Sequence, residues 1–118
     1  MEYLYYFENA NLTLRLVDYL CNKPQMPVAF ITLIHQMDAW IVKVKMSSPL
    51  NCQQNGDFRA YLNEIGIPEK PSRRINMALM SLELGQSAID IMRRYQVVVV
   101  FHDKPKLEEI QALQQILI

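Results

Sequence analysis

The chain has 118 residues, of which 51% are apolar and 20% are charged, and this composition is typical of one folded domain rather than a disordered segment. Twelve basic and twelve acidic residues give a formal net charge of zero. This balance argues against a nucleic-acid module or a polybasic membrane anchor, because both depend on a cationic excess. Without a bilayer-spanning apolar run or signal-peptide features, we expect a cytoplasmic domain over residues 1–118.

Alternating and β-branched residues predict the strands of the first half. Residues 2–7 are aromatic and extended in character, and residues 28–36 and 40–46 form two further strand patterns joined by a tight connection into a hairpin. Residues 12–22 place leucines at helical spacing and predict a helix, although the same leucines also alternate as in a hairpin.

Polar and proline residues punctuate the middle of the chain. Residues 47–57 are the most polar stretch, which predicts a long loop, and residues 58–65 follow as a short helix. Residues 67–71 are bounded by proline and predict a linker. None of these segments carries a repeat or a low-complexity tract.

The second half predicts one long helix over residues 73–95, a buried strand over residues 97–101 and a final helix that begins after Asp103. Without the short helix and the C-terminal helix, the element order is β-α-β-β-α-β, the order of a ferredoxin-like unit. We therefore predict an α+β fold with a ferredoxin-like core, an extra short helix and a C-terminal helix.

The predicted elements carry more apolar faces than a two-layer fold can bury. The helix over 73–95 confines its polar residues to a narrow stripe, and Gly85 in its middle would allow another backbone to approach closely. The strands over 2–7 and 28–36 are apolar on both faces. Either the short and C-terminal helices cover the second sheet face, or a second copy or another protein covers it.

We favour cover by a second molecule, because large exposed apolar patches usually mark interaction surfaces. The sequence thus predicts a non-enzymatic protein-interaction, assembly or regulatory module that acts as a homodimer or on another protein. The residues expected in this partner-binding surface are Tyr3, Tyr5, Phe7, Phe30, Met80 and Leu84.

An alternative function is a small-molecule sensor or a minor enzyme. His102, Asp103 and Lys104 follow a buried strand, where a ligand site can form together with the loop over 47–57. The competing structural interpretation is that Asp103 caps the last helix while its neighbours are solvated.

Arginine pairs bracket the long helix. Arg73 and Arg74 lie at its beginning, where cations are unfavourable for the helix dipole, and they are candidates for binding an acidic ligand or partner. Arg93 and Arg94 lie at the other end, so a single continuous helix keeps the two pairs apart and they form no common patch.

The remaining candidates favour structural roles. His35 lies near the hairpin and Cys52 lies in the polar stretch without a nearby base or cation, so we expect neither to act in catalysis. Cys21 and Cys52 form no metal-binding pattern, and three glycines supply no phosphate loop, so we predict neither a metal nor a cofactor. Nucleic-acid binding through the N-terminal aromatics is a second alternative, which the zero net charge disfavours.

Overall fold

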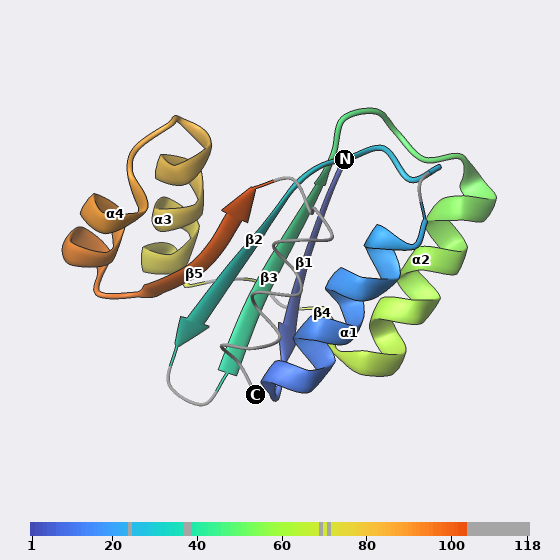
Figure 1. Ribbon diagram of the computed structural model, residues 1–118, viewed down its shortest axis with the longest axis horizontal. Helices are drawn as coiled ribbons and strands as arrows, with labels where there is room; N and C mark the ends of the chain where they lie inside the picture. Colours follow the sequence, from blue (N-terminus) through green and yellow to red (C-terminus); the bar gives the residue numbers. More distant parts are fainter. Residues whose placement is uncertain (24, 37–38, 69, 71, 104–118) are drawn as a thin grey trace.

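A computed structural model shows an antiparallel five-stranded sheet with a pair of helices packed on each face (Figure 1). The structure describes residues 1–23, 25–36, 39–68, 70 and 72–103. The strands are β1 (Glu2–Phe7), β2 (Val28–Gln36), β3 (Ala39–Met46), β4 (Ile67–Pro68) and β5 (Val98–Asp103). The helices in the described part are α1 (Ala10–Cys21), α2 (Cys52–Ile65), α3 (Arg73–Glu83) and α4 (Ala88–Tyr95).

The strand order is β4-β1-β3-β2-β5, and each neighbouring pair is antiparallel. The α+β class and the β2–β3 hairpin are confirmed, with His35 opposite Trp40. The ferredoxin-like order is not confirmed, because β5 is hydrogen-bonded to β2. The outer neighbour of β1 is the two-residue β4, which lies in the segment that we predicted as a linker.

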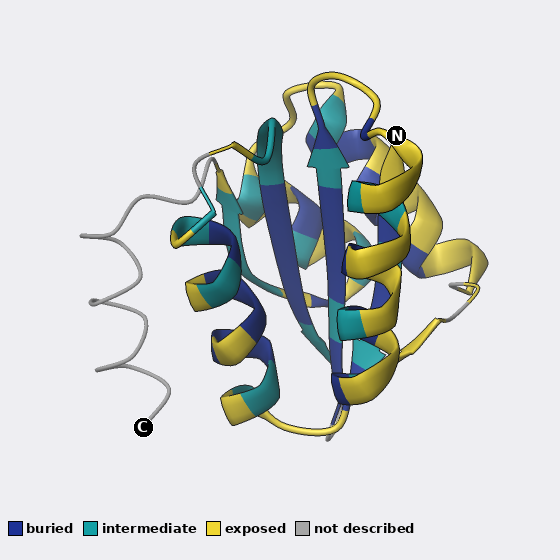
Figure 2. Ribbon diagram, turned by 90° about the vertical axis from the view of Figure 1, so that its right-hand side faces the viewer, coloured by how far each residue is buried: buried dark blue, intermediate teal, exposed yellow. Residues whose placement is uncertain are grey.

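Helices α1 and α2 cover one face of the sheet, and the middle strands of the sheet are largely buried (Figure 2). The aromatic side chains of β1 lie in this layer, and two of them also anchor α2. The hydroxyl of Tyr3 donates to Asn55 Oδ1 at 2.6 Å, and that of Tyr5 donates to Asn63 Oδ1 at 2.8 Å. These bonds satisfy tyrosine hydroxyls whose rings are buried.

Helix α2 begins at Cys52, so the prediction of a loop over 47–57 was wrong for its second half. Asn51 forms a capping box, in which its side chain accepts from the backbone N–H of Gln54 at 2.8 Å and the Gln54 side chain accepts in return at 3.3 Å. The first turns of α2 contribute no large apolar side chain to the core. Because those turns face solvent, their polar residues resemble a loop in the sequence.

The helix predicted over 73–95 is two helices. Gly85 adopts φ +91° after α3, and the N–H of Gln86 donates to the carbonyl of Ser81 at 3.1 Å. The N–H of Gly85 also donates to the carbonyl of Leu82 at 3.1 Å. These bonds form a Schellman motif that ends the helix. Ser87 then caps α4 by accepting from the N–H of Asp90 at 3.2 Å.

Helices α3 and α4 cover the second sheet face, which we had predicted to be covered by a second molecule. A second buried cluster there joins residues of α3, α4 and the strands. Its buried members are Ile34, Ile75, Ala78, Leu79, Leu82, Ile91 and Val97. The apolar surplus of the sheet is therefore largely buried within the chain, but by α3 and α4 instead of the short and C-terminal helices. The predicted C-terminal helix lies outside the described residues.

Replacing Gly85 with alanine should destabilise the fold by about 1–2 kcal/mol, because a Cβ disfavours the left-handed backbone that ends α3. Gly56 offers a matched control, since it lies inside α2 and an added Cβ would have no neighbour within 4 Å. Gly56→Ala should stabilise the protein by about 0.5–1 kcal/mol. Urea denaturation measures both changes, and a shift of the same sign in the two variants would contradict the assigned role of Gly85.

Candidate interaction surface

The outer side of α3 carries an apolar stripe. Arg73, Met77, Met80 and Leu84 follow one another at steps of four, three and four residues, so they lie on one side of the helix. Met77 is 42% exposed, Met80 is 53% exposed and Leu84 is 80% exposed. The opposite side of the same helix is buried, and it consists of Ile75, Ala78, Leu79 and Leu82. The stripe is thus separate from the side that packs on the sheet.

Helix α4 carries a further exposed apolar residue, Ile89. A continuous helix would place Ile89 on the same side as the buried Leu82, because the two are seven residues apart. The break at Gly85 shifts the phase, so that Ile91 is fully buried and Ile89 is 60% exposed. We refer to Met77, Met80, Leu84 and Ile89 as the outer apolar patch.

Three of the predicted partner-binding residues are buried inside the chain. Tyr3, Tyr5 and Phe7 belong to the core between β1 and the α1–α2 layer. Alternation along β1 shows that one face of the strand is buried, but it does not show whether the chain itself or a partner covers that face. These side chains are inaccessible in the folded chain, so they do not contribute to its exposed surface.

The other three predicted residues divide between two places. Met80 and Leu84 are exposed and belong to the outer apolar patch. Phe30 is half-buried on β2, where its ring centroid lies 4.9 Å from that of His102 and 5.5 Å from Lys45 Nζ. Phe30 therefore packs against neighbouring strands of its own sheet.

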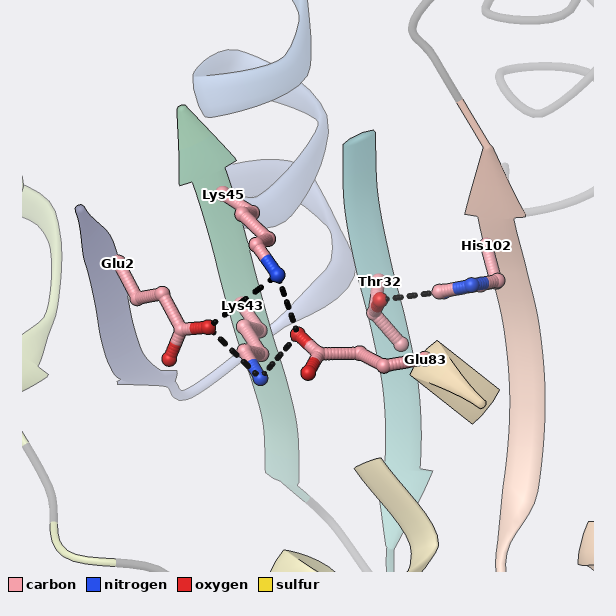
Figure 3. Close-up of polar contacts among 6 residues, drawn as sticks. All are labelled: Glu2, Thr32, Lys43, Lys45, Glu83 and His102. Carbon is pink, nitrogen blue, oxygen red and sulfur yellow. Dashed lines mark hydrogen bonds and ion pairs between the residues drawn. The ribbon is translucent and has the colours of Figure 1, made fainter. Parts of the chain in front are cut away.

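A charged cluster lies where α3 ends over the sheet (Figure 3). Lys43 is 7% exposed, and its Nζ donates to Glu83 Oε1 at 2.6 Å and lies 3.5 Å from Glu2 Oε1. Lys45 Nζ lies 3.7 Å from the same Glu83 oxygen and 3.9 Å from that of Glu2. Burial alone would raise the pKa of Glu83, but the hydrogen bond and the charges of the lysines outweigh it and lower that pKa.

His102 lies beside this cluster on β5. It shares a 2.6 Å hydrogen bond between its Nδ1 and the hydroxyl of Thr32, which is almost fully buried (Figure 3). Burial, assisted by the charge of Lys43, lowers the pKa of His102, although the carboxylates of Glu83 and Asp103 act in the opposite direction. Folding therefore shifts the His102 imidazole toward its neutral form.

Within the described residues, the members of the predicted ligand site are divided between the two faces of the sheet. His102 and Asp103 are successive residues of β5, so their side chains leave opposite faces of the strand. The segment over 47–57 leads into α2, which packs on the sheet face opposite to α3 and α4. Lys104 lies outside the described residues.

The two arginine pairs lie at one end of the molecule, contrary to the sequence prediction. Val98 begins β5, three residues after α4 ends at Tyr95, and it pairs with His35. Gln36, the next residue of β2, lines a cavity together with Ser72 and Ile75 at the beginning of α3. The beginning of α3 and the end of α4 therefore lie at the β2–β3 hairpin end of the sheet. We refer to the exposed cations of these segments as the basic end, which consists of Lys70, Arg73, Arg74, Arg93 and Arg94.

Both cysteines are free thiols, with Cys21 half-buried and Cys52 exposed. Burial, followed by the nearby charge of Asp18, raises the pKa of Cys21, which disfavours the nucleophilic thiolate. Within the described ranges, no group of three His, Cys, Asp or Glu residues could hold a metal ion. No helix of the described part has the length and apolar character to cross a membrane.

Breaking the charged cluster from either side should have unequal effects on stability. Glu83→Gln leaves the buried Lys43 ammonium with only the more distant Glu2, and we expect a loss of about 1–3 kcal/mol. Lys43→Met leaves two better-hydrated carboxylates, and we expect a change within about 1 kcal/mol. Urea denaturation at pH 7 compares the two, and a larger loss in Lys43→Met would contradict this account.

His102 should make stability depend on pH near neutrality. Because the folded-state pKa is lowered, its contribution is fully present above the unfolded-state value of about 6.5 and is lost as the pH falls through the folded-state value. We expect the unfolding free energy of the wild type to decrease between pH 7.5 and 5.5, and His102→Gln to reduce this dependence. An unchanged dependence in His102→Gln would refute the assignment.

No protein family model matches the sequence, and no curated protein does. Among solved structures, the C-terminal domain of YpbH, known from a crystal structure, has a similar fold with a TM-score of 0.55. The two chains are 13% identical, and the similarity covers 98% of this chain and 97% of that chain. At this level of identity the likeness concerns the fold alone.

Proposed function

We propose that this chain is a non-enzymatic protein-interaction module that binds another protein through the outer apolar patch. The observation that carries the proposal is that Met77, Met80 and Leu84 form a continuous exposed stripe opposite the buried side of α3. Scattered exposed apolar residues are common, but a stripe along one helix offers a partner a continuous apolar contact surface. Methionine side chains are flexible and polarisable, which suits them to binding surfaces.

The size of the patch favours a short segment of another protein over a second copy. Its exposed side chains correspond to roughly 400 Å² of apolar surface, within the ~300–600 Å² range of the largest patches on monomers. A stable complex of two folded proteins buries about 800 Å² per partner, which is more than this patch offers, so the patch is too small for a stable dimer of this chain.

The proposed compartment is the cytoplasm, where thiols are kept reduced. Cys21 and Cys52 are both free in the structure, which is consistent with such an environment. A regulatory or assembly role there fits a module whose activity is the binding of a partner.

Met80→Glu and Leu84→Glu should each weaken partner binding at least tenfold, because each places a carboxylate inside the apolar contact. The partner is first cross-linked to the protein in cells, identified by mass spectrometry and purified, and its affinity is then measured by calorimetry. Both variants should keep the far-ultraviolet circular dichroism and the unfolding midpoint of the wild type, because both positions are exposed.

Ile67→Glu provides the matched control, since it adds the same charge at an exposed apolar residue of β4. It should leave partner affinity unchanged. Unaltered affinity in both Met80→Glu and Leu84→Glu would refute the proposed surface. Sedimentation should show a monomer at low micromolar concentration, and a dimer that Leu84→Glu dissociates would identify a second copy as the occupant instead.

A further inference from the structure

A cavity of about 180 Å³ lies between the sheet and the beginning of α3. It is lined mainly by apolar groups of β1, β3 and α3, and two of its lining residues, Lys70 and Ser72, are exposed to solvent. Its lining residues are Leu4, Tyr5, Tyr6, Gln36, Ile41, Lys70, Ser72 and Ile75. The proposed function above does not use this cavity.

The size and lining of the cavity suit one side chain. An apolar protein cavity of about 150 Å³ is large enough to hold a benzene ring. The present cavity therefore has room for an aromatic ring or a branched aliphatic group. Leu4, Ile41 and Ile75 would contact such a group, and their apolar surfaces favour a ligand atom that is itself apolar.

The cavity adjoins the basic end. Lys70 belongs to both, and Arg73 directly follows the lining residue Ser72. Among the described residues, the five cations of the basic end form no ion pair with a carboxylate. Glu83 lies at the other end of α3, where it binds Lys43 and Lys45. Carboxylates on a ligand could therefore bind cations that form no ion pair within the described part of the chain.

The outer apolar patch and the cavity are joined through Arg73. This residue occupies the same side of α3 as Met77, and it begins the helix next to the cavity. A partner segment that lies along the stripe therefore has to bend around the first turn of α3 to enter the cavity, because the lining residue Ile75 is on the buried side of that helix.

We infer that the partner is an acidic segment that contacts the outer apolar patch and inserts one aromatic or branched aliphatic side chain into this cavity. The inference rests on the proposed function and specifies the chemistry of its partner. Apolar anchors in a pocket with a rim of complementary charge are the usual source of affinity in such contacts. A nucleic acid would satisfy the cations but would leave both the cavity and the apolar stripe without apolar partners.

The test selects peptides from a display library of random 12-residue sequences against the full chain and measures their affinity by fluorescence anisotropy. Selected peptides should carry net negative charge and one large apolar residue whose replacement by alanine weakens binding at least tenfold. Gln36→Trp, which places a ring at the cavity, should weaken binding by a similar factor.

Charge reversal tests the basic end. Arg73→Glu and Arg93→Glu should each weaken peptide binding severalfold, and the effect should shrink at high salt. Arg15→Glu is the matched control, because it reverses an exposed arginine on α1, which packs on the other face of the sheet. It should leave the affinity unchanged.

The outcomes separate this inference from the proposed function. If Leu84→Glu abolishes binding but Gln36→Trp and the alanine-substituted peptide bind normally, the interaction surface stands and the cavity assignment is wrong. Selected peptides without acidic residues, no enrichment of any peptide, or tighter binding of an RNA oligonucleotide that Arg73→Glu removes would each overturn the inference.

Discussion

The reversal of the chain at Gly85 is the constraint on which the second helix layer depends. A single helix over 73–95 would be about 35 Å long, which exceeds the roughly 30 Å of the nine-residue strand β2. The left-handed backbone of Gly85 divides this length into two helices that both fit on the sheet. The same break decides that Ile91 is buried and Ile89 is exposed, so it determines the composition of the outer surface as well as that of the core.

The sheet face beneath α3 and α4 has three regions of different chemistry. The charged cluster around Lys43 holds the end of α3, the apolar cluster around Ile34 fills the middle, and the cavity and the basic end occupy the hairpin end. Each region uses a different interaction, so the helix layer is fixed at one end by ion pairs and in the middle by packing. At the hairpin end, the described cations and the cavity are left available to a ligand.

This arrangement gives the proposed partner a preformed surface. Met77 and Met80 project from a helix whose opposite side is buried and whose beginning is capped by Ser72. Binding to a surface held in this way requires little ordering of the backbone, which leaves more of the contact free energy for affinity. The flexible methionines then adapt to the shape of the partner without changing the helix beneath them.

Local sequence patterns were sufficient for α1 and for β1, β2 and β3, because their hydrophobic periodicity follows from secondary structure alone. The same patterns predicted a strand at β5, but a buried one over residues 97–101, whereas β5 (Val98–Asp103) lies at the edge of the sheet and none of its residues is fully buried. They also identified Met80 and Leu84 as surface candidates. The pairing of β5 with β2 depends on contacts between residues about seventy positions apart, which no local pattern contains.

Tertiary structure likewise decided which apolar faces are covered from within the chain, and so removed Tyr3, Tyr5 and Phe7 from the accessible surface. The break at Gly85 left a local signal, a glycine two residues before the capping Ser87. Only the folded chain, however, shows that this break brings two arginine pairs to one end. Their proximity is set by where α3 and α4 pack on the sheet, whereas sequence spacing fixes only their positions along each helix.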